Sequence, residues 1–280
     1  MLFKNMLSVL LNLDLLFNQI LTTDAIVKFN NTFYIIYTMI VIKIGGSIIT
    51  DKSMYKKFNG QIVENIVKTL KRIDKQMVII HGGGSFGHIK SKEYGLPGQV
   101  SERTMEGMNI VHNDMAELDL KISKIFQENK IYNISLPVSS LVYNNKKNYN
   151  IFSKYLELGI TPISYGDTYI HSNEIGIYSG DNIAYDISKI LHPEFVIFFS
   201  DVDGIFDKNP KNNPDAKLLK TISTDFQYDT INPDVTGGIM NKYNKMKLIS
   251  DIGIPVYLIN GLYPERIYNI GKDNFTGTVV

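Results

Sequence analysis

The sequence predicts an α/β protein in which strands alternate with helices around a mainly parallel sheet. Residues 39–46, MIVIKIGG, predict a strand that ends at two glycines. Apolar residues recur at helical spacing over residues 61–73, and a second apolar run, MVII, occupies residues 77–80. A strand–helix–strand order without a hairpin turn favours parallel pairing through a right-handed crossover.

The same alternation continues to the C-terminus. The run FVIFF at 195–199 is apolar throughout, which is typical of a strand buried on both faces of a parallel sheet. The polar, asparagine-rich run 142–150 predicts a surface loop. We expect the remaining helices over 106–128, 152–158, 181–191 and 238–251, and the remaining strands over 132–136, 161–164 and 256–259.

The composition indicates a globular protein with a small partner. A chain of 280 residues that is 44% hydrophobic can bury one large core or two modest lobes. The net charge of +1 lacks the basic excess of a nucleic-acid binder. The chain has no cysteine, which excludes disulfides, thiolate metal sites and a cysteine nucleophile, and fits a reducing compartment. We therefore expect a cytoplasmic location.

Residues 1–38 differ in character from the rest of the chain. They are rich in leucine but interrupted by Asn12, Asp14 and Asn18. A membrane span needs about 18 uninterrupted apolar residues, so none is predicted. The segment could be an amphipathic helix, a poor signal peptide, or sequence upstream of a real start at Met39. We favour the last interpretation, because Met39 opens the first convincing strand.

Glycines cluster at three places beside predicted strands or helices. Gly45-Gly46 and residues 82–87 follow strands, and Gly237-Gly238 precedes a helix. The second cluster, within HGGGSFGH, matches the dinucleotide fingerprint G-x-G-x-x-G. That fingerprint needs a helix opening from the loop and an acidic residue about 20 positions later, whereas this segment runs into Gly95 and Pro97. Several loops whose backbone N–H groups surround one ligand fit a polyphosphate better.

Lysines lie close to the glycines in the sequence, although the chain has no P-loop motif. Lys43, Lys52, Lys211 and Lys242 are the candidate cations. Phosphoryl transfer depends mainly on positioning and on neutralising the charge of the transferred group, so lysines converging on glycine loops suit that chemistry. Asp181, in YSGDN at a predicted helix N-terminus, is the carboxylate best placed to orient them.

Several motifs together resemble the amino acid kinase superfamily: MIVIKIGGSIITDK, HGGGSFGH, YSGDN, SDVDGIFDKNPK and DVTGGIMNK. The resemblance extends from Met39 to the terminal GTVV, and GSFGH and SIITDK are similar to the isopentenyl phosphate kinases. It implies a three-layer αβα sandwich with an acceptor lobe over about residues 39–190, an ATP lobe over about residues 191–280, and a homodimer. The implied reaction, part of the alternate mevalonate route to isoprenoids, converts isopentenyl phosphate and ATP, with Mg²⁺, to isopentenyl diphosphate and ADP.

The resemblance also implies roles for individual residues, but no protein ligand for the metal. Lys43 and Lys52 would neutralise the transferred group, Asp181 would orient them, and His88 would complete the catalytic set. The implied acceptor-binding residues are Gly83, His88 and Gly180. The implied ATP-binding residues are Lys43, Gly45, Gly46, Ser47, Gly84, Asp201, Phe206, Asp207, Lys208, Asn209, Pro210, Lys211, Gly238 and Lys242.

His88 matters most for the choice of acceptor. The acceptor is a phosphate dianion, to which an imidazole can donate a hydrogen bond and, when protonated, offer a positive charge. Residues 97–115 could form an apolar wall for a prenyl chain or be ordinary core residues; the apolar members are Val100, Met105, Met108, Ile110, Val111 and Met115. Tyr165, Gly166 and Asp167 are secondary candidates, and His81, His112, His171 and His192 are expected to be structural.

Three other functions stay open at this stage. A sibling kinase acting on another phosphate or a phosphonate, such as fosfomycin, would share the His88 loop. An oxidoreductase would bind a dinucleotide at residues 82–87. A nucleotide sensor would keep the fold without the chemistry, although it would not need Lys43, Lys52, Asp181 and Lys242 together.

Overall fold

The computed structural model describes residues 25–29, 32–36, 39–144, 146–208, 210, 213–222 and 237–280. The chain divides into two units, Met1–Thr38 and Met39–Val280. In the first unit the described residues form an antiparallel hairpin of β1 (Ala25–Phe29) and β2 (Thr32–Ile36). Residues 1–24 lie outside the described residues, so the interpretation of this segment as upstream sequence stays a prediction. No helix within the described ranges is long and apolar enough to cross a membrane.

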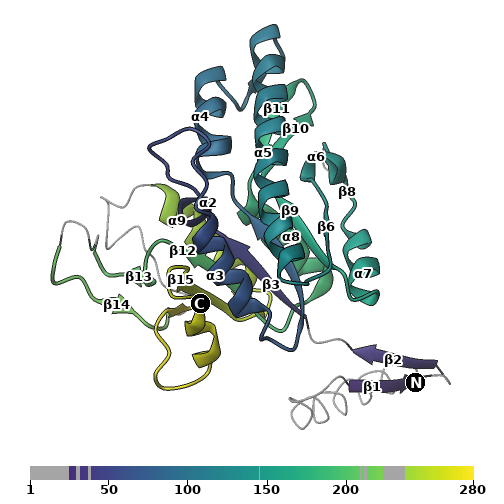
Figure 1. Cartoon of the computed structure of the whole chain (residues 1–280), viewed down its shortest axis with the longest axis vertical. Helices are drawn as coiled ribbons and strands as arrows, with labels where there is room; N and C mark the ends of the chain where they lie inside the picture. The colour runs from purple at the N-terminus through teal and green to yellow at the C-terminus, as the bar shows by residue number, and fades with distance from the viewer. Residues whose placement is uncertain are drawn as a thin grey trace, which may run out of the picture. The chain divides into compact units, whose positions relative to one another are not determined.

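A seven-stranded sheet forms the centre of the second unit (Figure 1). Its strand order is β16-β15-β12-β3-β4-β9-β6, and every pair is parallel except β15 with β16. Because parallel strands end at the same edge, the segments that follow β3, β4 and β12 are brought together. The strands are β3 (Met39–Ile44), β4 (Gln76–His81), β6 (Asn133–Ser135), β9 (Thr161–Tyr165), β12 (Val196–Ser200), β15 (Val256–Asn260) and β16 (Thr278–Val279).

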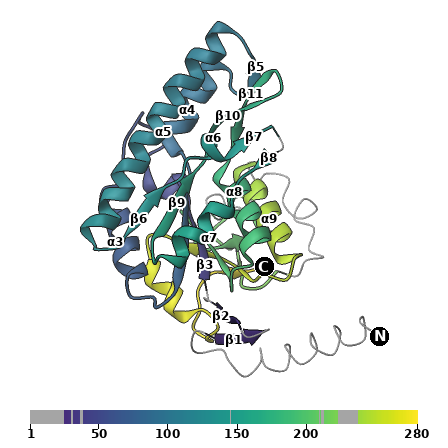
Figure 2. The same cartoon turned by 90° about the vertical axis from the view of Figure 1, so that its right-hand side faces the viewer.

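Helices cover both faces of this sheet (Figure 2). The side chains of β3 alternate between two separate cores, with Val41 in one and Ile40 and Ile42 in the other. The core that contains Val41 lies under α6 (Val138–Leu141), α7 (Asn150–Glu157), α8 (Gly180–Leu191) and α9 (Gly237–Ser250). The other lies under α2 (Gly46–Ile49), α3 (Gly60–Leu70), α4 (Gly84–Tyr94), α5 (Glu102–Glu128) and the 3₁₀ helix η2 (Pro264–Asn269). The predicted three-layer αβα sandwich is confirmed.

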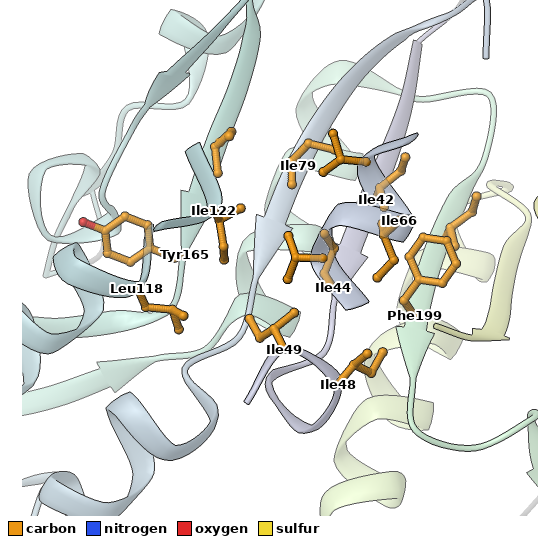
Figure 3. Packing of buried hydrophobic residues seen from close by; sticks show 14 of the residues in the cluster. Ile42, Ile44, Ile48, Ile49, Ile66, Ile79, Leu118, Ile122, Tyr165 and Phe199 are labelled. Atoms are coloured by element: carbon orange, nitrogen blue, oxygen red, sulfur yellow. The ribbon is translucent and has the colours of Figure 1, made fainter. Parts of the chain in front are cut away.

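Figure 3 shows the second core at close range. Ile42 and Ile44 of β3 and Ile66 of α3 lie within it, and Leu118 and Ile122 reach it from α5. All five side chains are fully buried. Removing such a side chain from water stabilises the fold by about 1.5–3 kcal/mol, so this core fixes β3 and α5 relative to each other.

The predicted helices and strands are all present, with ends shifted by a few residues, but several elements were not predicted. An antiparallel sheet joins β10 (Asp167–His171), β11 (Glu174–Tyr178) and β5 (Gly98–Gln99). Two short hairpins pair β13 (Ile205–Phe206) with β14 (Leu218–Leu219), and β7 (Val142–Tyr143) with β8 (Lys146–Lys147). The last hairpin lies in the segment 142–150, which was expected to be only a loop.

One step of the argument against a dinucleotide site was wrong. The helix α4 does open from the second glycine loop, at Gly84, and it ends at Gly95, whose φ of 72° is left-handed. Its apolar residues do not recur at helical spacing, so the sequence gives little sign of it. The strand that follows, β5, has two residues and pairs with β11 outside the central sheet. The order of elements beyond the loop therefore still differs from that of a dinucleotide fold.

Candidate active site

A cleft of about 900 Å³ lies at the carboxyl edge of the central sheet. Gly45 and Gly82 contribute to its lining directly after β3 and β4, and Asp201 directly after β12. The first turn of α8 contributes Gly180, and α9 contributes Lys242. Ligands of α/β sheets bind at this edge. Residues in or next to each of the three glycine clusters line the cleft.

The first two glycine loops touch through their backbones. A Cβ atom on Gly46 would lie 2.3 Å from the backbone nitrogen of Gly84, and one on Gly82 would lie 2.8 Å from that of Gly46. Gly84 has a φ of 49°, in the left-handed region that glycine adopts without strain. Only residues without a side chain allow this approach. As a result α2 and α4 begin side by side, and the N-termini of both helices lie at the cleft.

Thr50, which was not predicted, links the same two loops. Its buried hydroxyl donates to the carbonyl of Gly46 at 2.8 Å and accepts from the N–H of Ser85 at 2.9 Å. The Thr50 hydroxyl thus forms a hydrogen bond with one backbone group on each of the two loops. Nothing in the sequence near Thr50 marks it, because its partner Ser85 lies 35 positions away.

Lys43 and Asp181 form an ion pair in the cleft. The Nζ atom of Lys43, a buried residue of β3, lies 2.6 Å from Oδ1 of Asp181. Asp181 does not cap α8, because Ser179 is the N-cap residue and accepts from the N–H of Asn182. Burial alone would raise the pKa of Asp181, but Lys43, and after it Lys242 and other lysine charge, outweigh this and hold that pKa below its usual value. The carboxylate therefore stays charged and fixes the lysine.

Lys242 of α9 also lines the cleft. It is buried on α9, and its ammonium group donates to the hydroxyl of Ser200 at the end of β12. Burial and the nearby charge of Lys43 lower the pKa of Lys242 to about 8, although Asp181 and Asp201 oppose the shift. The two buried lysines thus repel each other, which makes the cleft favourable for an anion. Ser200 was not predicted.

Asp201 faces the first glycine loop. It accepts a hydrogen bond from Oγ of Ser47 at 2.8 Å. Partial burial alone would raise the pKa of Asp201, but Ser47, Lys52 and Lys242 outweigh this and lower it. The contact joins the ends of β3 and β12 at the position where the sequence predicts a nucleotide.

Lys52 and His88 line the open part of the cleft. Lys52 belongs to the turn between α2 and α3, and His88 lies on α4. Surrounding protein lowers the pKa of His88, and the charges of Lys52 and Lys43 lower it further. The imidazole is therefore neutral at pH 7 and can donate one hydrogen bond. A bound anion that offsets the lysines would favour the protonated form, which also offers a positive charge.

The predicted apolar wall is only partly correct. Val111 and Met115, which lie one turn apart on α5, line the cleft. Val100 and Met105 are about half exposed, at 49% and 52%, because Val100 precedes α5 and Met105 lies on a face of that helix away from the cleft. Met108 and Ile110 do not line the cleft either. Ile177 and Tyr178 of β11 complete the wall, and they were missed because the β10–β11 hairpin was not predicted.

The remaining candidates fall into three groups. Those that line the cleft are Gly45, Gly83, Gly84, Gly180, Phe206, Lys208 and Pro210, together with the secondary candidates Gly166 and Asp167. Gly238 lies in the first turn of α9, and the carboxylate of Asp207 accepts from the N–H of Lys217 at 2.8 Å. Asn209 and Lys211 lie outside the described residues.

Two of the histidines expected to be structural have distant carboxylate partners. His81 is fully buried with Nε2 3.3 Å from Asp119, and His112 Nδ1 lies 2.6 Å from Asp167. Within the described part of the chain, no group of three or more acidic, histidine or cysteine side chains could hold a metal ion. The cleft carboxylates of Asp181 and Asp201 instead contact Lys43 and Ser47, and that of Asp167 contacts His112.

Comparisons with known proteins agree with this geometry. Residues 38–260 match the model of the amino acid kinase family. The chain is 47% identical over 244 residues to the isopentenyl phosphate kinase of Thermoplasma acidophilum, an alignment that covers 86% of this chain and all of that protein. It is 30% identical over 248 residues to the isopentenyl phosphate kinase of Methanothermobacter thermautotrophicus, covering 82% and 93%. A crystal structure of the T. acidophilum enzyme in a product complex matches with a TM-score of 0.79 at 45% identity, covering 86% and 99%. Sequence and fold therefore point to the same relatives.

Proposed function

The chain belongs to the amino acid kinase family, and we propose that it transfers the terminal phosphoryl group of ATP to isopentenyl phosphate, giving isopentenyl diphosphate and ADP. The observation that carries this proposal is the placement of His88 in a cleft with Lys43 and Lys52, together with an apolar wall. Such a cleft offers a hydrogen-bond donor and positive charge to a phosphate, and an apolar surface to a hydrocarbon chain. The two isopentenyl phosphate kinases described above are similar to this chain over most of its length.

The ATP side of the reaction depends on fixed positive charge. In the proposed complex backbone N–H groups of the first two glycine loops and the ammonium groups of Lys43 and Lys242 contact phosphate oxygens. Asp181 holds Lys43 in place by the 2.6 Å ion pair. Because these groups are already positioned, little reorganisation is needed when negative charge redistributes during transfer.

The acceptor side depends on His88 and Lys52. The neutral imidazole donates a hydrogen bond to the acceptor phosphate, near Gly83 and Gly180, and Lys52 neutralises the group in transit. A phosphate oxygen needs little deprotonation before it attacks, so no strong general base is required. The transfer proceeds in line, from the ATP phosphorus to the acceptor oxygen, without a covalent enzyme intermediate.

Mg²⁺ is part of the proposal, on the strength of the family resemblance. The described residues contain no metal-binding cluster, and Asp181 and Asp201 already have partners. Mg²⁺ commonly keeps several waters and binds through substrate phosphates, so it would enter with the nucleotide. A homodimer also follows from the resemblance, and a cytoplasmic location is supported by the absence of cysteine from the sequence.

Turnover assays test the acceptor. ADP release would be followed with ATP and Mg²⁺ against isopentenyl phosphate, dimethylallyl phosphate, fosfomycin, UMP and N-acetylglutamate, with products identified by phosphorus NMR. A clear preference for isopentenyl phosphate and a new diphosphate signal would support the proposal. Preference for fosfomycin would identify the sibling kinase, and ATP binding without turnover of any acceptor would favour the nucleotide sensor.

A substitution at His88 tests how the acceptor is recognised. We expect His88→Ala to lower acceptor turnover at least about tenfold, because the variant loses a hydrogen bond to a charged group. ATP binding, measured by calorimetry, should change little, since His88 is assigned to the acceptor. Turnover within twofold of the unmodified protein would contradict this role for His88.

A further inference from the structure

The turn that carries Lys52 is closed at its base by backbone hydrogen bonds. Thr50 and Phe58 form a β-bridge at its two ends. The N–H of Asp51 donates to the carbonyl of Lys57 at 2.9 Å. These bonds fix where the turn begins and ends. At the tip, residues 54–56, the backbone of Met54 bonds only within the turn, donating to the carbonyl of Asp51 at 3.4 Å and accepting from the N–H of Lys57 at 3.3 Å.

Side chains at the tip attach the turn to α5. The hydroxyl of Tyr55 donates to Oδ2 of Asp114 at 2.5 Å, and Nζ of Lys56 lies 2.6 Å from Oδ1 of the same carboxylate. The same ammonium group lies 2.6 Å from Glu117, one turn further along α5. Both oxygens of the buried Asp114 are therefore occupied by the tip of a turn 59 positions away.

The backbone at Lys56 indicates that this attachment holds the turn in shape. Its φ of 58° is left-handed, which a lysine adopts at an energetic cost. A strained residue persists when the surrounding contacts determine its conformation. Here the contacts are the two carboxylates that bind its side chain, so the ion pairs and the backbone conformation depend on each other.

The attachment also connects the turn to both other parts of the acceptor site. Asp114 lies on α5 between Val111 and Met115, which line the cleft. Nζ of Lys90, on the same helix as His88, lies 5.2 Å from the ring centre of Tyr55. The tip of the turn is thus in contact with α5 and α4 together.

We propose that Asp114 is a positioning residue for Lys52, acting through the tip of the turn. The inference rests on the proposed function in one respect, namely that Lys52 neutralises the transferred phosphoryl group. Asp114 does not touch the substrate; it holds the turn on the helix that forms the acceptor wall. Lys52 thereby keeps a fixed position relative to both the acceptor and the glycine loops.

The attachment is stable across the working pH range. Burial and the adjacent Asp114 raise the pKa of Tyr55 to about 12, so its hydroxyl remains a donor. The pKa of Lys56 is raised as well, because its carboxylate partners outweigh the effect of burial. Loss of positioning should therefore come from substitution and not from a change of pH.

A double-mutant cycle separates positioning from general stability. Asp114→Asn keeps the shape of the side chain but removes its charge and places an amide donor against Tyr55 or Lys56. We expect kcat to fall about tenfold in the unmodified protein, with the KM for ATP little changed, since the loss falls on the transition state. In a Lys52→Ala background, assayed in single turnover, the same substitution should change the rate less than about twofold.

Matched variants keep the test decisive. Tyr55→Phe removes one hydrogen bond to Asp114 from an exposed side chain, and replaces Asp114→Asn in the cycle if that variant does not fold. Glu157→Gln breaks the exposed Lys154–Glu157 pair and should leave kcat unchanged. Melting temperatures of all variants identify any loss that reflects unfolding.

The outcomes distinguish this inference from the proposed function. Equal losses with and without Lys52, or no loss in the unmodified protein, would overturn the positioning role of Asp114. If the unmodified protein does not use isopentenyl phosphate, the proposed acceptor is wrong. The cycle is then run with the acceptor that supports ADP release, and its result still decides the role of Asp114.

Discussion

The two sides of the cleft are built in different ways. On the phosphate side, glycine loops meet backbone to backbone, and Lys43 and Lys242 are buried against Asp181 and Ser200. On the acceptor side, Lys52 and His88 are exposed to the cleft on a turn and a helix. That side is held together by contacts between side chains that are distant in the sequence, such as those of Asp114 with Tyr55 and Lys56.

This difference shows where each side can tolerate change. A backbone contact leaves no free volume, so a single methyl group displaces both loops. A contact between side chains loses only the interactions of the atoms that are removed, since the surrounding side chains can adjust. We therefore expect substitutions on the phosphate side to cost more activity, and those that only loosen the link between loops to cost less.

The largest effect is expected for Gly46→Ala. The new methyl group would lie 2.3 Å from the nitrogen of Gly84 and force the two loops apart. Misplacement of binding groups by more than 1 Å should lower kcat/KM by at least about a hundredfold. Steady-state assays would measure this, with Gly60→Ala as control, because there the methyl group meets only the ring of Phe58 at 3.2 Å. A loss under tenfold would mean that the close approach is not essential.

Asp181→Asn should have the next largest effect. The amide keeps the size of the side chain but leaves Lys43 without its charged partner, so the ammonium group is no longer fixed. We expect kcat to fall about a hundredfold, which is typical when one preorganised charge contact is lost. Glu64→Gln, which breaks an exposed pair with Lys68, should retain full activity. Equal kcat values for the Asp181 variant and the unmodified protein would contradict the orienting role.

The pH dependence should reveal Lys242. Its pKa is lowered to about 8 in the free protein, and the charged form, which binds phosphate, exists below that value. Activity is therefore present at lower pH and lost as the pH rises. We expect kcat/KM for ATP to fall about tenfold for each pH unit above 8, because this parameter reports the free enzyme. In Lys242→Arg the guanidinium stays charged, so the decline should disappear. A profile that stays level to pH 9.5 in the unmodified protein would disprove this assignment.

The smallest effect is expected for Thr50→Val. Valine fills the same space but leaves the N–H of Ser85 and the carbonyl of Gly46 without their partner. The free energy of unfolding should fall by about 1–3 kcal/mol, with kcat only a few-fold lower, since the glycine contact itself is kept. Denaturant unfolding would measure the change, with Thr69→Val as control because the hydroxyl of Thr69 donates to the carbonyl of Asn65 within its own helix. Equal losses for both variants would show that the link between the loops has no special role.

The periodicity of the sequence predicted the parts of the fold that depend on local pattern. The strands β3, β4 and β12 are continuous apolar runs, and α3 buries Val63, Ile66, Val67 and Leu70 at helical spacing. The helix α4 and the hairpin β10–β11 lack such a pattern, because α4 packs mainly against α5 and the hairpin is partly exposed, whereas the central strands are buried on both faces. Sequence reasoning therefore missed or misjudged them, and with the hairpin it missed Ile177 and Tyr178 in the cleft wall.

The sequence by itself determined the α/β class, the sandwich implied by its motifs, and the positions of the glycines and lysines at strand ends. These features are local, since a strand end and the loop after it are adjacent in the chain. Only the tertiary structure decided which side chains meet: Thr50 with Ser85, Lys242 with Ser200, and Asp114 with Tyr55 and Lys56. Such pairs lie tens of residues apart, and their contact depends on how the packed elements cross, which no local pattern encodes.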